Sequence, residues 1–259
     1  MTFGKCVDIF ARQSSRFEKL PFMSFKNSTA IITGGTGTLG SIVAQDFIER
    51  GARIAVPYTS EKSLASIPPI LVAERDRALF AKADLTSEKD VQAFTNQTVQ
   101  KFGSVEILVN TTGGYTGGKP VRDVTLEEWE KMMNLNLKTT FLMCRSVVPI
   151  MQKNNYGRII NISAMAAIMP RANIGPYAVS KRALITLTEA IAEETKGTGI
   201  TVNAIAPSII VTEANKHAMP NADYDTWVTA EEISHLIIYL CSQEARSVSG
   251  NVIKIFGGV

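Results

Sequence analysis

The sequence predicts an α/β fold in which helices cover both faces of a doubly wound parallel sheet. Three observations support this fold class. Short apolar runs alternate along the chain with longer amphipathic stretches. The apolar runs are continuous rather than alternating with polar residues, which is typical of parallel strands buried on both faces. A glycine cluster also separates the first apolar run from the first amphipathic stretch, as a tight strand-to-helix turn requires.

The expected elements alternate between strand and helix, and glycines or polar residues end most of them. The strands are expected at 29–33, 54–56, 79–83, 107–110, 158–162, 201–205 and 252–256. The helices are expected at 41–50, 87–102, 126–153, 177–195 and 230–241. The sequence shows no internal repeat and no linker, so we expect residues 27–259 to form a single domain.

Residues 1–26 are predicted to be a flexible N-terminal extension. They hold five basic and two acidic residues, which accounts for the whole net charge of +3, so residues 27–259 sum to zero. The body is therefore not expected to bind nucleic acid. We expect a cytoplasmic protein, or a mitochondrial matrix protein if residues 1–26 are a presequence. An upstream start codon, with Met23 as the true first residue, is an alternative.

The composition argues against several classes of protein. No apolar run approaches 18 residues, so no membrane span is expected. The three cysteines, Cys6, Cys144 and Cys241, are too far apart for a disulfide framework or a zinc site. Because the chain has only two histidines, no metal site is expected.

The glycine turn is the strongest local motif. Glycines allow a tight turn and a close backbone approach to a pyrophosphate, which then faces the N-terminus of the following helix. A strand before the turn and a helix after it make a dinucleotide site the favoured interpretation. The predicted cofactor-binding residues of this turn are Gly34, Gly35, Thr36, Gly37, Thr38, Leu39 and Gly40.

The end of the second strand predicts how the cofactor's adenosine ribose is bound. An acid there favours NAD, whereas a basic residue favours NADP. The strand ends with Tyr58, Thr59 and Ser60, which are hydroxyl residues, followed by Glu61 and Lys62. We expect NADPH or NADH, with a slight preference for NADPH.

Tyr177 and Lys181 are a candidate proton-transfer pair. Their i, i+4 spacing places them on one face of a helix. A phenol has a pKa near 10, and a neighbouring ammonium favours the phenolate, so we expect Lys181 to lower the pKa of Tyr177. The helix follows the fifth strand, at the sheet edge where ligands bind in such folds.

Together these motifs resemble the classical short-chain dehydrogenases/reductases over about residues 27–259. The matching segments, in the family's order, are the turn at 33–40, Asp84-Leu85-Thr86, Asn110-Thr111-Thr112-Gly113, Asn134-Leu135-Asn136-Leu137, Tyr177 with Lys181, Pro207 to Thr212, and Gly257-Gly258. The resemblance implies a Rossmann-type sheet of about seven strands, an NAD(P)-dependent oxidoreductase acting on a small molecule, and a homodimer or homotetramer.

The resemblance also implies a role for each matching residue. Tyr177 would be the acid/base, Lys181 would hold the nicotinamide ribose, and Asn136 would hold a water in the proton relay. Further cofactor contacts would come from Asp84, Leu85, Asn110, Thr111, Gly113, Pro207, Ile210 and Thr212.

The chain departs from the family at three places. Thr38 stands where the family usually has glycine, and Thr111-Thr112 replace Asn-Ala. The family's catalytic serine normally lies thirteen residues before the tyrosine, where this chain has Ala164, and Ser163 is one residue earlier. In a regular strand these two side chains point to opposite faces. We therefore expect the usual serine to be missing, unless a bulge re-aims Ser163 as a catalytic residue.

A narrower resemblance accommodates the alanine. Quinonoid dihydropteridine reductases work without that serine and carry motifs similar to 113–118 and 219–227 of this chain. The candidate substrate contacts are Ala164, Tyr115, Met219 and Trp227, the last two in a short lid at 208–229. The predicted function is hydride transfer to a small carbonyl of the ketone or 3-oxoacyl type. The alternatives are quinonoid dihydropterin reduction, and a cofactor-binding regulator without turnover.

Overall fold

A parallel sheet runs through the part of the chain that this computed structural model describes, which is residues 23–64 and 67–259. Its strand order within that part is β3-β2-β1-β4-β5-β6-β7, so the predicted doubly wound fold of seven strands is confirmed. The strands are β1 (Thr29–Thr33), β2 (Arg53–Tyr58), β3 (Ala78–Lys82), β4 (Ile107–Asn110), β5 (Gly157–Ile162), β6 (Ile200–Pro207) and β7 (Val252–Ile255). The order reverses between β1 and β4, the switch point at which such sheets bind ligands.

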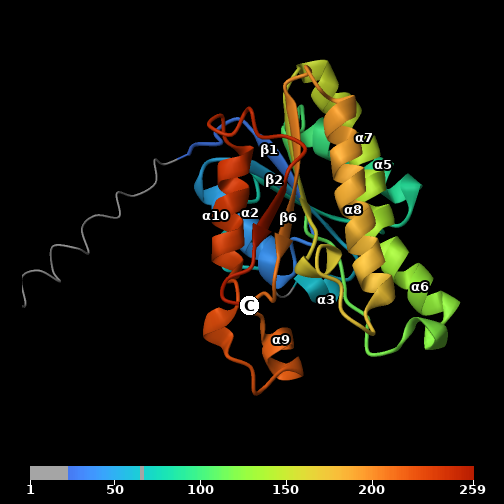
Figure 1. Cartoon of the computed structure of the whole chain (residues 1–259). Helices are drawn as coiled ribbons and strands as arrows, with labels where there is room; N and C mark the ends of the chain where they lie inside the picture. Colours follow the sequence, from blue (N-terminus) through green and yellow to red (C-terminus); the bar gives the residue numbers. More distant parts are fainter. Residues whose placement is uncertain (1–22, 65–66) are drawn as a thin grey trace, which may run out of the picture.

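Helices cover both faces of the sheet (Figure 1). One face carries α2 (Thr38–Glu49) and α10 (Ala230–Cys241), which pack against each other. The other face carries α5 (Glu88–Phe102), α7 (Thr139–Asn154) and α8 (Gly175–Glu194). The shorter helices are α3 (Glu61–Leu64), α4 (Pro69–Ala73), α6 (Leu126–Met133) and α9 (Glu213–Ala218).

The strand β1 shows why a continuous apolar run indicates a strand that is buried on both faces of a sheet. Its neighbouring residues Ile31 and Ile32 are both fully buried, yet they belong to different core clusters. Ile32 packs in the cluster that includes Phe47 of α2, whereas Ile31 packs with Phe94 of α5. Because successive side chains alternate between faces, a strand covered on both sides must be apolar at every position.

The expected single helix over 126–153 is divided in the structure. The α-helical segments α6 and α7 flank a π-helix at Asn134–Lys138. Asn136, within the π-helix, is fully buried, and Thr139, the first residue of α7, donates its hydroxyl to the Leu135 carbonyl at 2.8 Å. The periodicity of apolar residues continues across a single π-turn, so the sequence did not reveal this break.

Part of the predicted extension lies against the body. Phe25 is buried, its ring contacts that of Phe47 at 5.0 Å, and its amide donates to the Arg50 carbonyl at 2.8 Å. Residues 1–22, which form the rest of the predicted extension, lie outside the described residues. Within the described part of the chain, no helix is both long enough and apolar enough to cross a membrane.

Candidate functional site

The candidate site lies where the carboxyl ends of β1, β4 and β5 adjoin the start of α8. The glycine turn leaves β1 and enters α2. The segment from Thr111 to Gly118 follows β4. Ser163 and Ala164 follow β5, and Tyr177 and Lys181 lie in the first two turns of α8. The topology therefore gathers at one sheet edge residues that are up to about 150 positions apart in the chain.

The glycine turn fits a bound pyrophosphate. A Cβ at Gly35 would lie 2.7 Å from Val56 Cγ1, and a Cβ at Gly40 would overlap the backbone of Gly34, so both positions are closed to side chains. No side chain caps the N-terminus of α2, and its first turn holds no acid. Gly37 and Thr38 are exposed there. An uncapped helix start beside exposed backbone is the donor arrangement that binds phosphates.

The predicted residues after β4 hold the turn in place. The Thr111 hydroxyl donates to the Thr33 carbonyl at 2.6 Å, and the Thr112 amide donates to the Thr33 hydroxyl at 3.2 Å. The two threonines that replace the family's Asn-Ala thus tie β4 to β1. Asn110 is buried, its amide donates to Asn161 Oδ1 at 2.9 Å, and its own Oδ1 has no protein partner.

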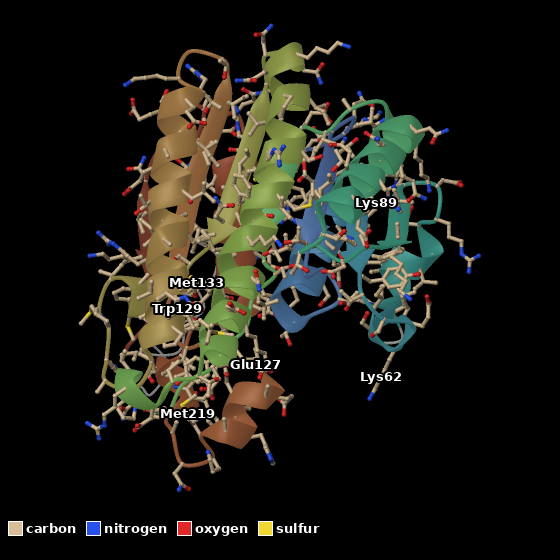
Figure 2. The ribbon with its side chains drawn as sticks, turned by 90° about the vertical axis from the view of Figure 1, so that its right-hand side faces the viewer. Lys62, Lys89, Glu127, Trp129, Met133 and Met219 are labelled. Atoms are coloured by element: carbon tan, nitrogen blue, oxygen red, sulfur yellow. The ribbon has the colours of Figure 1, made fainter. Side chains whose placement is uncertain are left out.

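The end of β2 presents hydroxyls and an acid. The Tyr58 hydroxyl donates to Glu61 Oε1 at 3.1 Å. Thr59 and Ser60 are exposed beside them. Lys62 follows Glu61, and Figure 2 shows its side chain extending away from the ribbon.

Asp84 closes a turn after β3. Its Oδ1 accepts from the Thr86 amide at 2.8 Å and from the Thr86 hydroxyl at 2.7 Å, and the Asp84 pKa is lowered by these bonds. Ser87, rather than Asp84, caps α5. Asp84 is exposed, whereas the neighbouring Leu85 is buried in the core.

Asn136 joins three segments of the site. Its Oδ1 accepts from the Gly114 amide at 2.8 Å, and its Nδ2 donates to the Gly114 carbonyl at 3.1 Å and to the Ser180 hydroxyl at 3.0 Å. Ser180 in turn donates to the Tyr177 carbonyl at 2.8 Å. The π-helix therefore places a buried amide that fixes both the loop after β4 and the start of α8.

Lys181 is buried beside this network. Its ammonium donates to the Ile162 carbonyl at 2.8 Å. A Cβ at Gly113 would lie 3.0 Å from Lys181 Nζ and 2.9 Å from Asn136 Oδ1, so both side chains converge on a glycine that leaves them room. Burial lowers the pKa of Lys181 to about 8, because a desolvated ammonium is less stable than one in water.

The expected lowering of the Tyr177 pKa is wrong for the protein alone. Burial, with a smaller contribution from Tyr115, raises the pKa of Tyr177 to about 12. Lys181 is not among the causes of this shift, and its ammonium donates to the Ile162 carbonyl. The phenol of Tyr177 is therefore protonated at neutral pH, as a proton donor must be.

Ser163 and Ala164 differ in direction as a regular strand requires. The Ser163 hydroxyl is buried and donates to the Lys181 carbonyl at 2.8 Å. Ala164 has extended backbone angles, with φ −161° and ψ 157°. In extended backbone successive side chains alternate, so the Ala164 methyl group points to the face opposite to the Ser163 hydroxyl. The structure therefore shows no bulge that would re-aim Ser163.

The predicted lid is anchored at both ends. Ile210 forms a parallel bridge with Val228, and the Thr212 hydroxyl caps α9 by accepting from the Asn215 amide. Trp227 is buried, and its ring contacts that of Tyr224, another residue of the lid, at 4.8 Å. Pro207, also predicted to contact the cofactor, is the buried last residue of β6. Met219 directly follows α9 and is partly exposed.

Several residues of the site were not predicted from the sequence. Gly114, Ser180 and the Ile162 carbonyl are the partners of Asn136 and Lys181, and only the tertiary structure brings them together. Among the described residues, no group of three or more His, Cys, Asp or Glu side chains could hold a metal ion.

The chain is similar to known proteins over most of its length. Residues 28–223 match the family model described as short chain dehydrogenase. A 3-oxoacyl-[acyl-carrier-protein] reductase of Thermotoga maritima is 31% identical over 250 residues, covering 92% of this chain and 99% of the relative. A solved short-chain type dehydrogenase/reductase from Mycobacterium ulcerans is 25% identical, with a TM-score of 0.85 over 91% of this chain and 90% of the other. A blue fluorescent protein from a metagenomic library, solved in complex with NADPH, is 27% identical, with a TM-score of 0.81 over 91% and 98%.

Proposed function

The chain belongs to the short-chain dehydrogenase family, and from that premise we propose that it reduces a small carbonyl compound of the ketone or 3-oxoacyl type. The family assignment makes it an NAD(P)-dependent oxidoreductase. The observation that carries the proposal is the constellation of Tyr177, Lys181 and Asn136 at the carboxyl edge of the sheet. A protein that only bound the cofactor would not need a buried lysine and a protonated phenol beside it.

The residues of the site fit a bound nicotinamide dinucleotide. The glycine turn and the uncapped start of α2 would hold its pyrophosphate, and the residues around Gly113 would hold its nicotinamide end. When bound, the dinucleotide supplies or accepts the hydride. Lys181, with its ammonium 2.8 Å from the Ile162 carbonyl, would hold a ribose hydroxyl and present a positive charge to the site.

In the proposed reduction, Tyr177 donates the proton. Its hydroxyl loses the proton to the substrate oxygen as the carbonyl carbon receives the hydride. Lys181 stabilises the phenolate that this step leaves, because a neighbouring ammonium favours the charged form. Asn136 fixes Gly114 and, through Ser180, the first turn of α8. It therefore holds the loop after β4 and the Tyr177 phenol in fixed positions relative to each other.

Quinonoid dihydropterin is a second candidate substrate. Ser163 is committed to the Lys181 carbonyl, and Ala164 offers only a methyl group, so the end of β5 gives no hydroxyl to a substrate carbonyl. A quinonoid acceptor needs less polarisation than a ketone, which favours it at such a site. Assaying the purified protein with both dinucleotides, and with ketones, acetoacetyl-CoA and quinonoid dihydropterin as acceptors, tests both candidates.

The choice between NADPH and NADH rests on the end of β2. The hydroxyls of Tyr58, Thr59 and Ser60, together with Lys62, support a 2′-phosphate. The Glu61 carboxylate, 3.1 Å from the Tyr58 hydroxyl, opposes it by charge. NADPH is therefore preferred only if the Glu61 carboxylate moves away from the end of β2 when the 2′-phosphate binds.

We also propose that the protein is a homodimer or homotetramer. Exposed apolar side chains occur on the helices of one face, namely Leu126 and Trp129 of α6, Phe141 of α7 and Val179 of α8, with Leu126 71% exposed. A second copy would cover these side chains. Light scattering of the purified protein gives the copy number.

A further inference from the structure

Tyr115 is the aromatic residue nearest to the candidate proton donor. Its ring meets that of Tyr177 edge to face, with the ring centroids 5.0 Å apart. Tyr115 is 64% exposed, so much of its side chain remains in contact with solvent beside Tyr177. Among the described residues, the Tyr115 hydroxyl has no protein hydrogen-bond partner. The phenol is therefore free to bond to a ligand that enters above Tyr177.

The base of Tyr115 is fixed to the catalytic network. The preceding residue, Gly114, bonds to Asn136 through both its amide and its carbonyl. Farther along the loop, the Gly118 amide donates to the Asn173 carbonyl at 2.7 Å. Gly118 has φ +98°, a conformation that favours glycine. The loop is thus tied at two points on either side of Tyr115.

Gly117 makes the observed ring position possible. A Cβ there would overlap the Tyr115 hydroxyl and would lie 2.9 Å from its Cζ. Any larger residue at 117 would displace the ring from this position. The sequence therefore combines an aromatic residue with the glycine that its placement over Tyr177 requires.

We propose that Tyr115 donates a hydrogen bond to the acceptor oxygen of the substrate and so replaces the hydroxyl that the end of β5 lacks. This inference rests on the proposed reductase function. Tyr177 transfers its proton to that oxygen as the hydride reaches the carbon, whereas Tyr115 keeps its proton and stabilises the charge that develops on the oxygen. Ser163 cannot serve in this way, because its hydroxyl is bonded to the Lys181 carbonyl. The substrate class that follows is a compact acceptor whose oxygen can lie between two phenols.

The coupling of the two phenols supports this placement. The charge of Tyr115 contributes to the raised pKa of Tyr177, after the larger effect of burial. The ring contact, with the centroids 5.0 Å apart, places the two phenols in one neighbourhood, as this electrostatic contribution also does. In the proposed complex, the substrate oxygen lies over this ring contact and receives a hydrogen bond from each phenol.

The test compares Tyr115→Phe, which keeps the ring, with Tyr115→Phe combined with Ala164→Ser. Acetoacetyl-CoA and 9,10-phenanthrenequinone are the acceptor probes. We expect Tyr115→Phe to lower kcat and kcat/KM together by about 10²-fold, the usual effect of removing one such donor. Cofactor affinity should not change, and the added serine should restore most of the loss. A single variant with wild-type kcat, or a loss that the serine does not restore, would overturn the proposal.

Two controls separate this inference from the proposed function. If Tyr177→Phe retains full turnover, the proposed proton transfer fails; if Tyr177→Phe is inactive while Tyr115→Phe is normal, only the inference fails.

NMR of protein labelled with ¹³C at tyrosine Cζ follows the Tyr177 titration without any substrate. Tyr115→Phe should lower the Tyr177 pKa, because the neighbouring phenolate is lost. An identical titration in both proteins would show that the hydroxyls are too far apart.

Discussion

The Ser163 hydroxyl donates a 2.8 Å hydrogen bond to the backbone carbonyl of Lys181 on α8. The serine at the end of β5 is thereby directed toward the helix backbone, and the position that follows it holds an alanine. The bond also anchors the segment of α8 that carries Lys181. Ser163, a catalytic candidate from the sequence, therefore has a structural role, because its hydroxyl is used to hold α8 against β5.

Replacing Ser163 should therefore affect stability more than turnover. Ser163→Ala removes one buried hydrogen bond, so we expect the free energy of unfolding to fall by about 1 kcal/mol. Turnover should stay within a few-fold of wild type. Thr195→Val is a matched control, because Thr195 also gives a buried hydroxyl to a backbone carbonyl of α8, that of Ile191. Denaturant unfolding and steady-state kinetics measure both; a hundred-fold loss of kcat in Ser163→Ala alone, the size expected for a lost transition-state donor, would contradict this role.

The buried ammonium of Lys181 should make the stability of the cofactor-free protein depend on pH. Its pKa is about 8 in the folded protein and 10.5 when unperturbed, so the unfolded state binds the extra proton between these values. The free energy of unfolding should therefore rise with pH across this window. Lys181→Met removes the buried charge, and we expect it to be more stable at neutral pH by on the order of 1–3 kcal/mol.

That gain should shrink as the pH rises above about 8. The raised pKa of Tyr177 acts in the opposite direction above pH 10, so the comparison is made below that value. Lys89→Met, at an exposed position on α5, is the control and should not alter the slope. If the free energy of unfolding changes with pH in the same way in wild type and in Lys181→Met, the Lys181 ammonium is not desolvated in the folded protein.

Two glycines of the turn after β1 should respond differently to alanine. At Gly40 a Cβ would meet the backbone of Gly34, so we expect Gly40→Ala to lower the free energy of unfolding by about 1–3 kcal/mol. At Gly37, which is exposed and has φ −91°, the Cβ would lie 3.3 Å from the Gly34 carbonyl oxygen. Gly37→Ala should therefore change stability by less than about 1 kcal/mol.

Gly37→Ala should nevertheless weaken dinucleotide binding, because its methyl group points to where the pyrophosphate would lie. Thermal melts and a fluorescence titration with NADPH distinguish the two effects. Unchanged affinity in Gly37→Ala would place the pyrophosphate elsewhere.

The acid at the end of β2 should set part of the cofactor preference. Glu61→Gln keeps an acceptor for the Tyr58 hydroxyl but removes the negative charge that would face a 2′-phosphate. We expect the dissociation constant for NADH divided by that for NADPH to rise about tenfold, which means a stronger preference for NADPH. A tenfold change corresponds to roughly 1.4 kcal/mol of charge interaction. Fluorescence titrations of both proteins measure the ratio. A ratio that does not move would mean that Glu61 lies away from the bound ribose.

The strands and the glycine turn were predictable because their signals are local. Ile31 and Ile32 face opposite layers, which demands an unbroken apolar run, and the turn combines that run with glycines that leave no room for side chains. The π-helix around Asn136 was not predictable, because its cause is a set of contacts with Gly114 and Ser180. These contacts join segments that are distant in the sequence.

The proton-transfer pair shows the same limit. The spacing of Tyr177 and Lys181 located the site but gave the wrong direction for the Tyr177 pKa. The spacing cannot show that the Lys181 ammonium bonds to the Ile162 carbonyl, nor that Tyr115 covers the phenol. Likewise, Phe25 gives no local sign of packing against Phe47.

The most direct test follows NADPH and NADH oxidation by wild type and Tyr177→Phe, after a fluorescence titration has shown that both proteins bind the dinucleotide. The acceptors are ketones, acetoacetyl-CoA and quinonoid dihydropterin. We expect wild type to oxidise the bound dinucleotide with at least one acceptor, and Tyr177→Phe to bind it equally well but to turn over about 10²–10⁴-fold more slowly. Equal turnover by both proteins, or binding without oxidation by wild type, would contradict proton donation by Tyr177.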